Sequence, residues 1–250
     1  MLFDADRWTE IWVTITRNKT RSLLTCFGVF WGILMLVILL GLGTGLKNGI
    51  LKNTDGFATN SVFFIADRTS EPYRGFNKGR EWNIRNRDLE SIRREVSGLE
   101  AISPVLWGAR ADKNVVYGQL SGTYNVKGVD PAYFRIEAQH VLFGRLLNEI
   151  DAREKRKVCL IGSRRNENPC GRYIRVNGIY YQVVGVVRER ARVNIGGRSQ
   201  ESVFLPFTTM QQTLNQGDVI HFLAASAYKD VSIQRIIDDI TGILRRQNSI

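Results

Sequence analysis

The hydrophobic pattern is dominated by one long apolar run near the N-terminus. Residues 22–46, SLLTCFGVFWGILMLVILLGLGTGL, contain no charged side chain; of these 25 residues 17 are apolar, five are Gly and three are Ser or Thr. A helix needs about 20 apolar residues to cross a hydrocarbon core of roughly 30 Å, whereas the apolar region of a secretory signal has only about 7 to 15. A buried core helix is usually shorter and carries a polar stripe. The pattern therefore predicts a transmembrane helix over residues 21–46, with a signal anchor that is cleaved late or not at all as the alternative.

The segment before this run has the spacing of an amphipathic helix. Trp8, Ile11, Trp12 and Ile15 fall at positions i, i+3, i+4 and i+7, so they share one helical face. Two Trp side chains on an apolar face suit the boundary between lipid headgroups and acyl chains. Residues 1–20 are therefore predicted to form an amphipathic interfacial segment on the inner leaflet. A helix packed against a partner protein is the alternative.

Beyond residue 46 the pattern alternates between short strand-like and helix-like segments. Residues 60–67 and 102–111 read as strands on either side of a helix that Asn86 caps and Gly98 ends. This order is βαβ-like. A last helix over residues 232–246 has an apolar face that must pack on a sheet. The residues of this face are Ile233, Ile236, Ile237, Ile240, Ile243 and Leu244.

The middle of the chain is richer in β-type patterns. Residues 115–120 and 124–129 alternate and predict a hairpin, and Asn177-Gly178 between two β-rich arms predicts a second hairpin with a type I′ turn. A strand at residues 202–205, a helix at 208–214 and a strand at 219–228 follow. The sequence thus predicts an α+β protein, in which residues 47–112 and 207–250 form an α+β part and residues 113–206 form an inserted β-rich part.

Charges on either side of the apolar run predict its orientation. Arg17, Lys19 and Arg21 precede the run, and Lys47 and Lys52 follow it. Lys and Arg close to a span favour the cytoplasmic side. We therefore expect a cytoplasmic N-terminus and an extracytoplasmic location for residues 47–250.

The charge balance of residues 47–250 is basic, with a net charge of +10, because residues 1–46 hold only four basic and three acidic side chains of the chain's 35 and 24. Such an excess can attract nucleic acid or anionic lipid. The basic residues occur in scattered short groups without a zinc-finger spacing or an RNA-binding aromatic signature. We therefore expect no nucleic-acid partner, and the basic residues form either a solvated face or a contact with lipid headgroups.

The residue types that support catalysis are few. His140 and His221 lie in no metal or triad motif, and the carboxylates of Asp130, Glu149 and Asp151 show no pairing logic in the sequence. The stretch GLGTGLKNG at residues 41–49 matches neither phosphate-binding glycine motif. We therefore predict no catalytic residue, no metal site and no cofactor.

The remaining reactive residues are three cysteines. Cys26 lies inside the apolar run, which leaves Cys159 and Cys170. Cys159 sits in the apolar run of residues 158–161 and is expected to be a small core residue. The alternative is a disulfide between Cys159 and Cys170 across a tight turn, in an oxidising compartment.

The glycines of the apolar run repeat at a spacing of four. Gly28 and Gly32 share one helical face, and so do Gly41 and Gly45. Small residues at this spacing let helices approach closely in lipid. These four positions are the candidate helix-packing sites.

Several motifs in a fixed order suggest a family. They are RSLLTCFGVFWGI at the start of the run, VKGVDPAYF, GRLLNEID, KVCLIG, GRYIRVNGIYYQVVGV and VFLPFTTMQ. In their order and spacing they resemble MacB-type ABC transporter permeases over nearly the whole chain.

The resemblance implies an inner-membrane permease that works in efflux by mechanotransmission. Its first transmembrane helix would be followed by a periplasmic core domain with a porter-like α+β part and the inserted β-rich part. The implied partners are a separate or fused cytoplasmic ABC ATPase, a second copy in a homodimer, a periplasmic adaptor protein and membrane lipid. ATP hydrolysis would belong to the ATPase, so this chain is expected not to be an enzyme.

The resemblance also implies three further membrane helices after the domain, and no second apolar run of spanning length occurs before Ile250. A fragment, a shortened gene product and a degenerate paralogue are the open explanations. The first hypothesis is a MacB-like permease subunit, or its N-terminal portion, that exports a substrate or extracts a hydrophobic one from the membrane. The alternative is a single-span, membrane-anchored extracytoplasmic binding or scaffold protein without transport activity.

Overall fold

Two compact units make up the chain, Met1–Asn53 and Thr54–Ile250. The structure, a computed structural model, describes residues 8–9, 12–13, 19–53, 60–69, 75, 77–108, 114–162, 168–189 and 201–249. The expected N-terminal apolar helix and the expected mixture of helices and strands are both present.

The first unit is built on one long helix, α2 (Lys19–Asn53), of 35 residues. At about 1.5 Å per residue its length is about 50 Å. Within the described part of the chain it is the one helix long and apolar enough to cross a membrane, over Lys19–Leu46. The helix therefore contains the predicted span and continues seven residues beyond Leu46.

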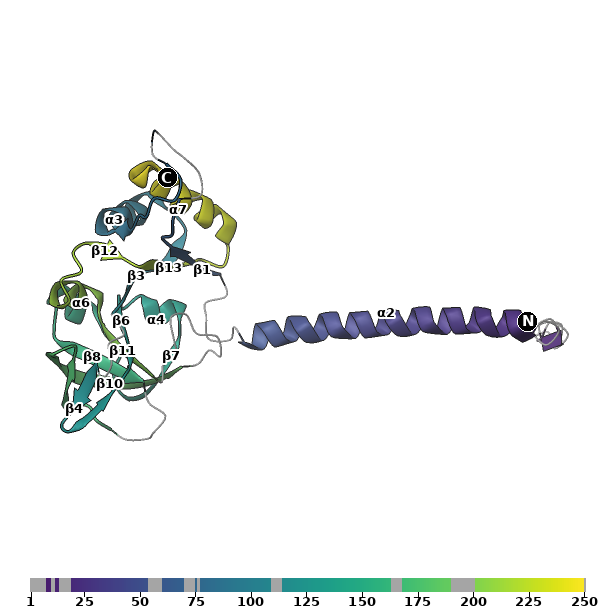
Figure 1. Ribbon diagram of the computed structural model, residues 1–250, viewed down its shortest axis with the longest axis horizontal. Coiled ribbons are helices and arrows are strands. Elements are labelled where there is room, and N and C mark those ends of the chain that lie inside the picture. Colours follow the sequence, from purple (N-terminus) through teal and green to yellow (C-terminus); the bar gives the residue numbers. More distant parts are fainter. Residues whose placement is uncertain are drawn as a thin grey trace. The chain divides into compact units, whose positions relative to one another are not determined.

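An eleven-stranded sheet organises the second unit, as far as the described residues show (Figure 1). In spatial order its strands are β1 (Ser61–Ile65), β13 (Phe222–Ala227), β3 (Leu99–Trp107), β6 (Asn125–Val129), β11 (Ser202–Pro206), β8 (Val158–Gly162), β10 (Ile179–Glu189), β9 (Tyr173–Val176), β4 (Val115–Tyr117) and β5 (Leu120–Gly122). Strand β7 (Gln139–Gly144) pairs with β10 beside this path. Neighbouring strands are antiparallel except for the parallel pairs β6–β11 and β8–β10. A separate two-stranded sheet joins β12 (Val219–Ile220) to β2 (Ile84–Arg85).

The predicted strand–helix–strand unit is present, but another strand lies between its two strands in the sheet. Strands β1 and β3 are each antiparallel to β13, which lies between them, so β1 and β3 run parallel to each other. Helix α3 (Asn86–Glu95) connects the two along the chain. The result is a split βαβ arrangement, whose middle strand comes from a segment more than 100 residues later and therefore leaves no local signal.

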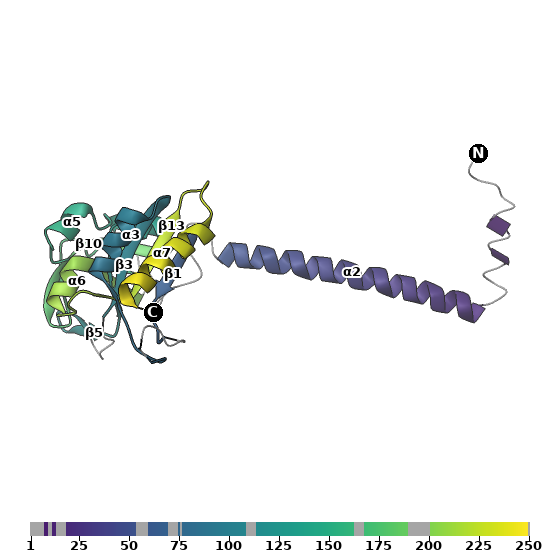
Figure 2. The same ribbon diagram turned by 90° about the horizontal axis from the view of Figure 1, so that it is seen from above.

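The sheet is buried on both faces where β13 crosses it, since successive side chains of a strand point to opposite faces. Leu223 and Ala225 join the core with α3 and with α7 (Ile233–Asn248). Phe222 and Ala224 join a second core with α4 (Tyr133–Ile136). Figure 2 shows α7 lying beside β1 and β13.

The apolar face predicted for the last helix is the one that α7 buries. The fully buried members are Ile236, Ile240, Ile243 and Leu244, while Ile233 and Ile237 are half-buried. Two shorter helices, α5 (Glu149–Arg153) and α6 (Phe207–Thr213), complete the unit. The prediction of helix 208–214 is confirmed within one residue.

The Asn-Gly hairpin is confirmed residue by residue. Strands β9 and β10 pair with Val176 opposite Ile179, and the two turn residues Asn177 and Gly178 have φ angles of +47° and +87°. Both positive values match a type I′ turn, whose twist fits that of the flanking strands.

The other predicted hairpin, between residues 115–120 and 124–129, is wrong. Gly118, with a φ of +57°, lies in an earlier turn, so that β4 pairs with β5. Strand β6 instead enters the middle of the main sheet between β3 and β11. The Asn114 amide makes this separation possible, because its side chain bonds both the N–H and the carbonyl of Tyr124 at 2.8 and 2.7 Å and ends the hairpin there.

The predicted strand 219–228 is interrupted at His221. Residues before it pair with β2 in the small sheet, and residues after it form β13.

The main sheet contains strands from both predicted parts of the domain, because β3, from residues 47–112, pairs with β6, from residues 113–206. The division into residues 47–112 with 207–250, and 113–206, stays a prediction.

Candidate functional site

The four glycines proposed for helix packing all lie in α2. A Cβ atom added to Gly28, Gly32, Gly41 or Gly45 would meet no other atom within 4 Å. At about 100° per residue, the first pair and the second pair lie about 140° apart around the helix axis. The helix therefore presents two separate small-residue surfaces, and their packing role stays a prediction.

Two hydroxyl groups of α2, those of Thr25 and Thr44, are satisfied within the helix itself. Thr25 Oγ1 donates to the carbonyl of Arg21, and Thr44 Oγ1 donates to that of Leu40, each at 2.9 Å. In hydrocarbon an unpaired hydroxyl would be costly. These bonds make the helix compatible with a bilayer.

The flanking residues are only partly described. Lys19 and Arg21 form the exposed start of α2, and Trp8 and Trp12 are helical and more than half exposed. The other members of the predicted interfacial face and positive flank, Ile11, Ile15 and Arg17, lie outside the described residues. The interfacial helix and the positive flank stay predictions.

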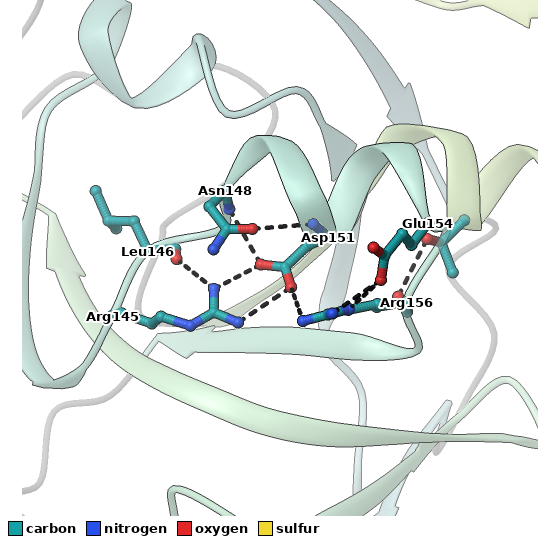
Figure 3. Close-up of polar contacts among 7 residues, drawn as sticks. Arg145, Leu146, Asn148, Asp151, Glu154 and Arg156 are labelled. Atoms are coloured by element: carbon teal, nitrogen blue, oxygen red, sulfur yellow. Dashed lines mark hydrogen bonds and ion pairs between the residues drawn. The ribbon is translucent and has the colours of Figure 1, made fainter.

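A polar cluster of the second unit is centred on Asp151 (Figure 3). Asn148 caps the start of α5: its Oδ1 accepts from the Asp151 N–H at 2.9 Å, and the Asn148 N–H donates to Asp151 Oδ2 at 3.1 Å. This reciprocal pair is a capping box. It holds the Asp151 carboxylate at the first turn of α5, where the helix dipole also favours a negative charge.

Arg145, directly after β7, binds that carboxylate with both terminal nitrogens. The distances are 2.5 Å from Nη1 to Oδ2 and 3.0 Å from Nη2 to Oδ1. A second guanidinium, that of Arg156, lies 4.0 Å from Oδ1. Burial of Asp151 opposes its ionisation, but the Arg145 hydrogen bonds and the Asn148 amide outweigh it, so the pKa of Asp151 falls below its ordinary value of 3.8.

The same cluster joins α5 to α6. Thr208 Oγ1 donates to the carbonyl of Ala152 at 2.5 Å, and Thr209 Oγ1 donates to that of Arg156 at 3.1 Å. The sequence shows no pairing logic for Asp151, and the structure gives it Arg145, Asn148 and Arg156 as partners. The spacing Asn148-x-x-Asp151 was the signal for the cap, but no local pattern identifies Arg145 as the ion-pair partner.

Asp130, for which the sequence likewise shows no pairing logic, is paired as well. Its Oδ2 lies 3.3 Å from Arg93 Nη2, and its Oδ1 accepts from the Ala132 N–H at 3.1 Å. The carboxylate thus fastens the start of α4 to the end of α3, which is a structural role.

Two glycines allow the backbone around Arg145 to lie very close to that of β10. Gly144 and Gly185 face each other where β7 pairs with β10. A Cβ at Gly185 would clash with the carbonyl of Arg145, and one at Gly144, whose φ is +72°, would clash with that of Val184. Only glycine fits both positions.

The half-buried His221 has a structural contact. His221 Nδ1 accepts a hydrogen bond from the Trp107 N–H at 2.9 Å, and the two rings stack with centroids 6.1 Å apart. Burial lowers the pKa of His221 from 6.5. The ring therefore accepts this bond as neutral imidazole, which is the structural role expected for it, whereas His140 lies exposed on β7.

The cysteines are all free thiols. Cys159 is fully buried, as predicted for a core residue, and burial raises the pKa of its thiol. Within the described residues, no three His, Cys, Asp or Glu side chains lie close enough together to hold a metal ion.

The clefts among the described residues of the second unit include two of different character. One, of about 420 Å³, is lined by charges of both signs, including Arg93, Arg135, Glu100 and Glu149. The other, of about 310 Å³, is more apolar, and its lining includes Tyr117, Leu120, Tyr124, Ile174 and Val203. Neither brings together a nucleophile and a base.

Comparison with known proteins points to one family. A family model described as the MacB-like periplasmic core domain matches residues 22–243. The macrolide export ATP-binding/permease protein MacB of Bdellovibrio bacteriovorus is 23% identical over 244 residues, 95% of this chain and 37% of that protein. The protein of the same name from Aggregatibacter actinomycetemcomitans is 27% identical over 241 residues, 92% of this chain and 36% of that protein.

A solved structure shares the fold. The crystal structure of the periplasmic region of MacB from Actinobacillus actinomycetemcomitans matches with a TM-score of 0.64 and 22% identity, over 80% of this chain and 90% of that one. The chain spans about a third of the length of the curated relatives it matches.

Proposed function

Because this chain belongs to the family of the MacB-like periplasmic core domain, we propose that it couples ATP hydrolysis by a cytoplasmic ABC ATPase to a conformational change outside the membrane. The chain carries the MacB-like periplasmic domain of an ABC transporter permease, with one candidate transmembrane helix. The observation that carries the proposal is the extent of the family match, from Ser22 in α2 to Ile243 in α7. Helix and domain are thus covered by one family as a continuous unit.

Each part of the chain has a place in this proposal. The N-terminal segment with Trp8 and Trp12 contacts the ATPase at the inner face of the cytoplasmic membrane. Helix α2 carries the motion outward, and Gly28 and Gly32, or Gly41 and Gly45, pack against companion helices, including those of a second copy in a homodimer. The domain delivers the motion to its extracytoplasmic partners, among them a periplasmic adaptor protein.

The proposed substrate class is supported by the names of relatives and by the candidate transmembrane helix. Curated relatives are named for export of macrolides and, in one case, of pyoverdine, and the apolar helix α2 would give the chain access to molecules in the membrane. We propose export, or extraction from the membrane, of a hydrophobic substrate. ATP hydrolysis itself is assigned to the partner, since the proposal gives this chain a mechanical role.

Co-purification tests the coupling proposal. An affinity-tagged chain, extracted in mild detergent from membranes of its own host, is expected to retain an ABC ATPase that mass spectrometry identifies. The variant Trp8→Glu/Trp12→Glu should lose the ATPase while remaining in the membrane fraction. The matched control is Tyr173→Glu/Tyr180→Glu, which changes two exposed aromatic residues of the other unit and should keep the ATPase. If the unaltered chain retains no ATPase, a membrane-anchored binding or scaffold protein is the better description.

A further inference from the structure

Asn60 fastens the start of the sheet to the loop that precedes α7. It is the first described residue after α2. Its side-chain Nδ2 donates to the carbonyl of Tyr228 at 3.1 Å and to that of Val231 at 2.8 Å. Its own carbonyl accepts from the Ala227 N–H at 2.9 Å. Three hydrogen bonds therefore converge on Asn60, and their partners lie 167 to 171 positions away in the sequence.

The acceptor loop is held in place from its other side. The Tyr228 N–H donates to the carbonyl of Gly98 at 3.1 Å, and the Val231 N–H donates to that of Tyr228 at 3.0 Å. A Cβ added at Gly98 would lie 3.0 Å from the Val231 methyl groups, so the loop packs tightly on the start of β3. The carbonyls that Asn60 binds therefore belong to a fixed loop.

This loop leads directly into α7. The helix begins at Ile233, two residues after Val231, and its 16 residues give it a length of about 24 Å. At its far end, Arg80 Nη2 donates to the carbonyls of Asn248 and Ser249 at 2.6 and 2.9 Å. Helix α7 is thus held near its start by Asn60 and at its end by Arg80, and it packs on β1 and β13 between them (Figures 1 and 2).

The strand after Asn60 resists a pull less well than these bonds do. Strand β1 is a five-residue strand at the edge of the described sheet, and it pairs only with β13. A ladder pulled from one end opens one pair at a time, whereas the bonds converging on Asn60 are loaded together. We therefore expect a force applied through the chain before residue 60 to load the Asn60 bonds before it opens the β1–β13 ladder.

We propose that Asn60 is the positioning residue that transmits displacement of α2 to the loop before α7, and so to α7 itself. The inference rests on the proposed function, in which α2 moves relative to the domain. It adds the contact through which the motion passes, namely the hydrogen bonds from the Asn60 side-chain amide to the carbonyls of Tyr228 and Val231.

Single-molecule pulling on the full chain in detergent tests this inference without any partner or ATP. Handles are attached through an introduced azide amino acid at residue 46, the end of the candidate span, and at the exposed Lys155. Asn60→Asp keeps the size of the side chain but removes both donated hydrogen bonds. We expect the rate at which β1 detaches at constant force to rise about 5- to 30-fold, as for loss of one or two typical interactions.

Two controls separate transmission from a general loss of stability. Val176→Ala truncates a buried residue of β9, far from Asn60 in the strand order, and should leave the detachment rate of β1 unchanged although it lowers the melting temperature. With handles at residues 155 and 250 the load reaches the end of α7 first, so Asn60→Asp should change the release rate of α7 much less than it changes that of β1, whereas Arg80→Gln should speed the release of α7.

An equal effect of Asn60→Asp in both pulling directions, or an equal effect of Val176→Ala on β1, would overturn the inference. The outcome is independent of the ATPase experiment. If the chain retains no ATPase, the proposed function fails whatever the force data show; if it retains one but Asn60→Asp detaches at the normal rate, only the role of Asn60 fails.

Discussion

Asp151 is completely buried, while the guanidinium of its partner Arg145 is 43% exposed. Because the two side chains differ in burial, breaking the ion pair has a different cost in solvation for each of them. The carboxylate depends on its partners for all of its solvation, whereas water can hydrate the guanidinium if the pair is broken. The pair is therefore worth less than a fully buried ion pair but more than a surface one.

Asp151→Asn is expected to lower the free energy of unfolding by about 2 to 3 kcal/mol, because charge-assisted hydrogen bonds to Arg145 and the cap to Asn148 are lost or weakened. Urea unfolding of the full chain in detergent, followed by Trp fluorescence, measures the change. Glu154→Gln is the matched control: it removes the exposed ion pair with Arg156 and should cost less than about 1 kcal/mol. If Asp151→Asn also lowers the free energy of unfolding by less than about 1 kcal/mol, the cluster in Figure 3 contributes little to stability.

The pH dependence of this contribution has a defined sign. The pKa of Asp151 is lower in the folded chain than its ordinary value of 3.8, so the ionised form stabilises the fold. The contribution is fully present above about pH 5 and is lost as the pH falls through the folded pKa. The difference in unfolding free energy between the unaltered chain and Asp151→Asn should therefore stay constant from pH 7 to 5 and shrink below pH 3.8. A difference that grows on acidification would contradict this.

Gly185→Ala should destabilise the domain by about 3 kcal/mol or more, since the added methyl meets a backbone carbonyl that cannot move without shifting β7. Gly242→Ala is the control with the opposite sign. Its Cβ would enter open space on α7, and replacing a helical Gly by Ala stabilises by up to about 1 kcal/mol. Thermal unfolding of the two variants should shift in opposite directions, and a neutral Gly185→Ala would mean that the strand crossing is looser than described.

At the scale of elements, α2 carries the most specific prediction. Gly32→Leu should abolish detergent-resistant self-association of the isolated span if the Gly28–Gly32 face packs against another helix, because the larger side chain holds the backbones apart. Gly41→Leu tests the second face separately. Val29→Leu, which adds bulk about a quarter of a turn from Gly28, is the control and should leave association intact. Association of Gly32→Leu at the normal strength would remove this face from the proposal.

Some elements could be predicted from local sequence, and others could not. The hairpin at Asn177-Gly178 and helix α7 could be predicted because their signals lie within about 15 residues: a pair of residues that tolerate positive φ, and an apolar repeat of helical period. Strand β6 could not be placed in the same way. Its partners β3 and β11 come from both sides in the sequence, and an alternating pattern specifies which face is buried but not which strand lies alongside.

At the scale of the whole molecule, the orientation of the chain is the prediction that the proposed function most needs. A green fluorescent protein fused after Ile250 is expected to stay dark in a Gram-negative host, and alkaline phosphatase fused there to be active, if residues 47–250 lie outside the cytoplasm as the positive flank predicts. Lys19→Glu/Arg21→Glu should weaken this bias, since both basic residues lie at the start of α2. If the green fluorescent protein fused to the unaltered chain is fluorescent, residues 47–250 lie in the cytoplasm, and their assignment as an extracytoplasmic domain is wrong.

The sequence by itself determined the apolar helix, the basic flank, the class of the domain and the family, because each rests on composition, on period or on the order of motifs along the chain. Only the tertiary structure decided which residues hold the domain together. The contacts that do so join segments that are distant in sequence: Thr208 and Thr209 with the segment of α5, Gly144 with Gly185, and Asn60 with the loop before α7. Such contacts depend on strand order and register, which arise from packing of the whole sheet and have no local signature.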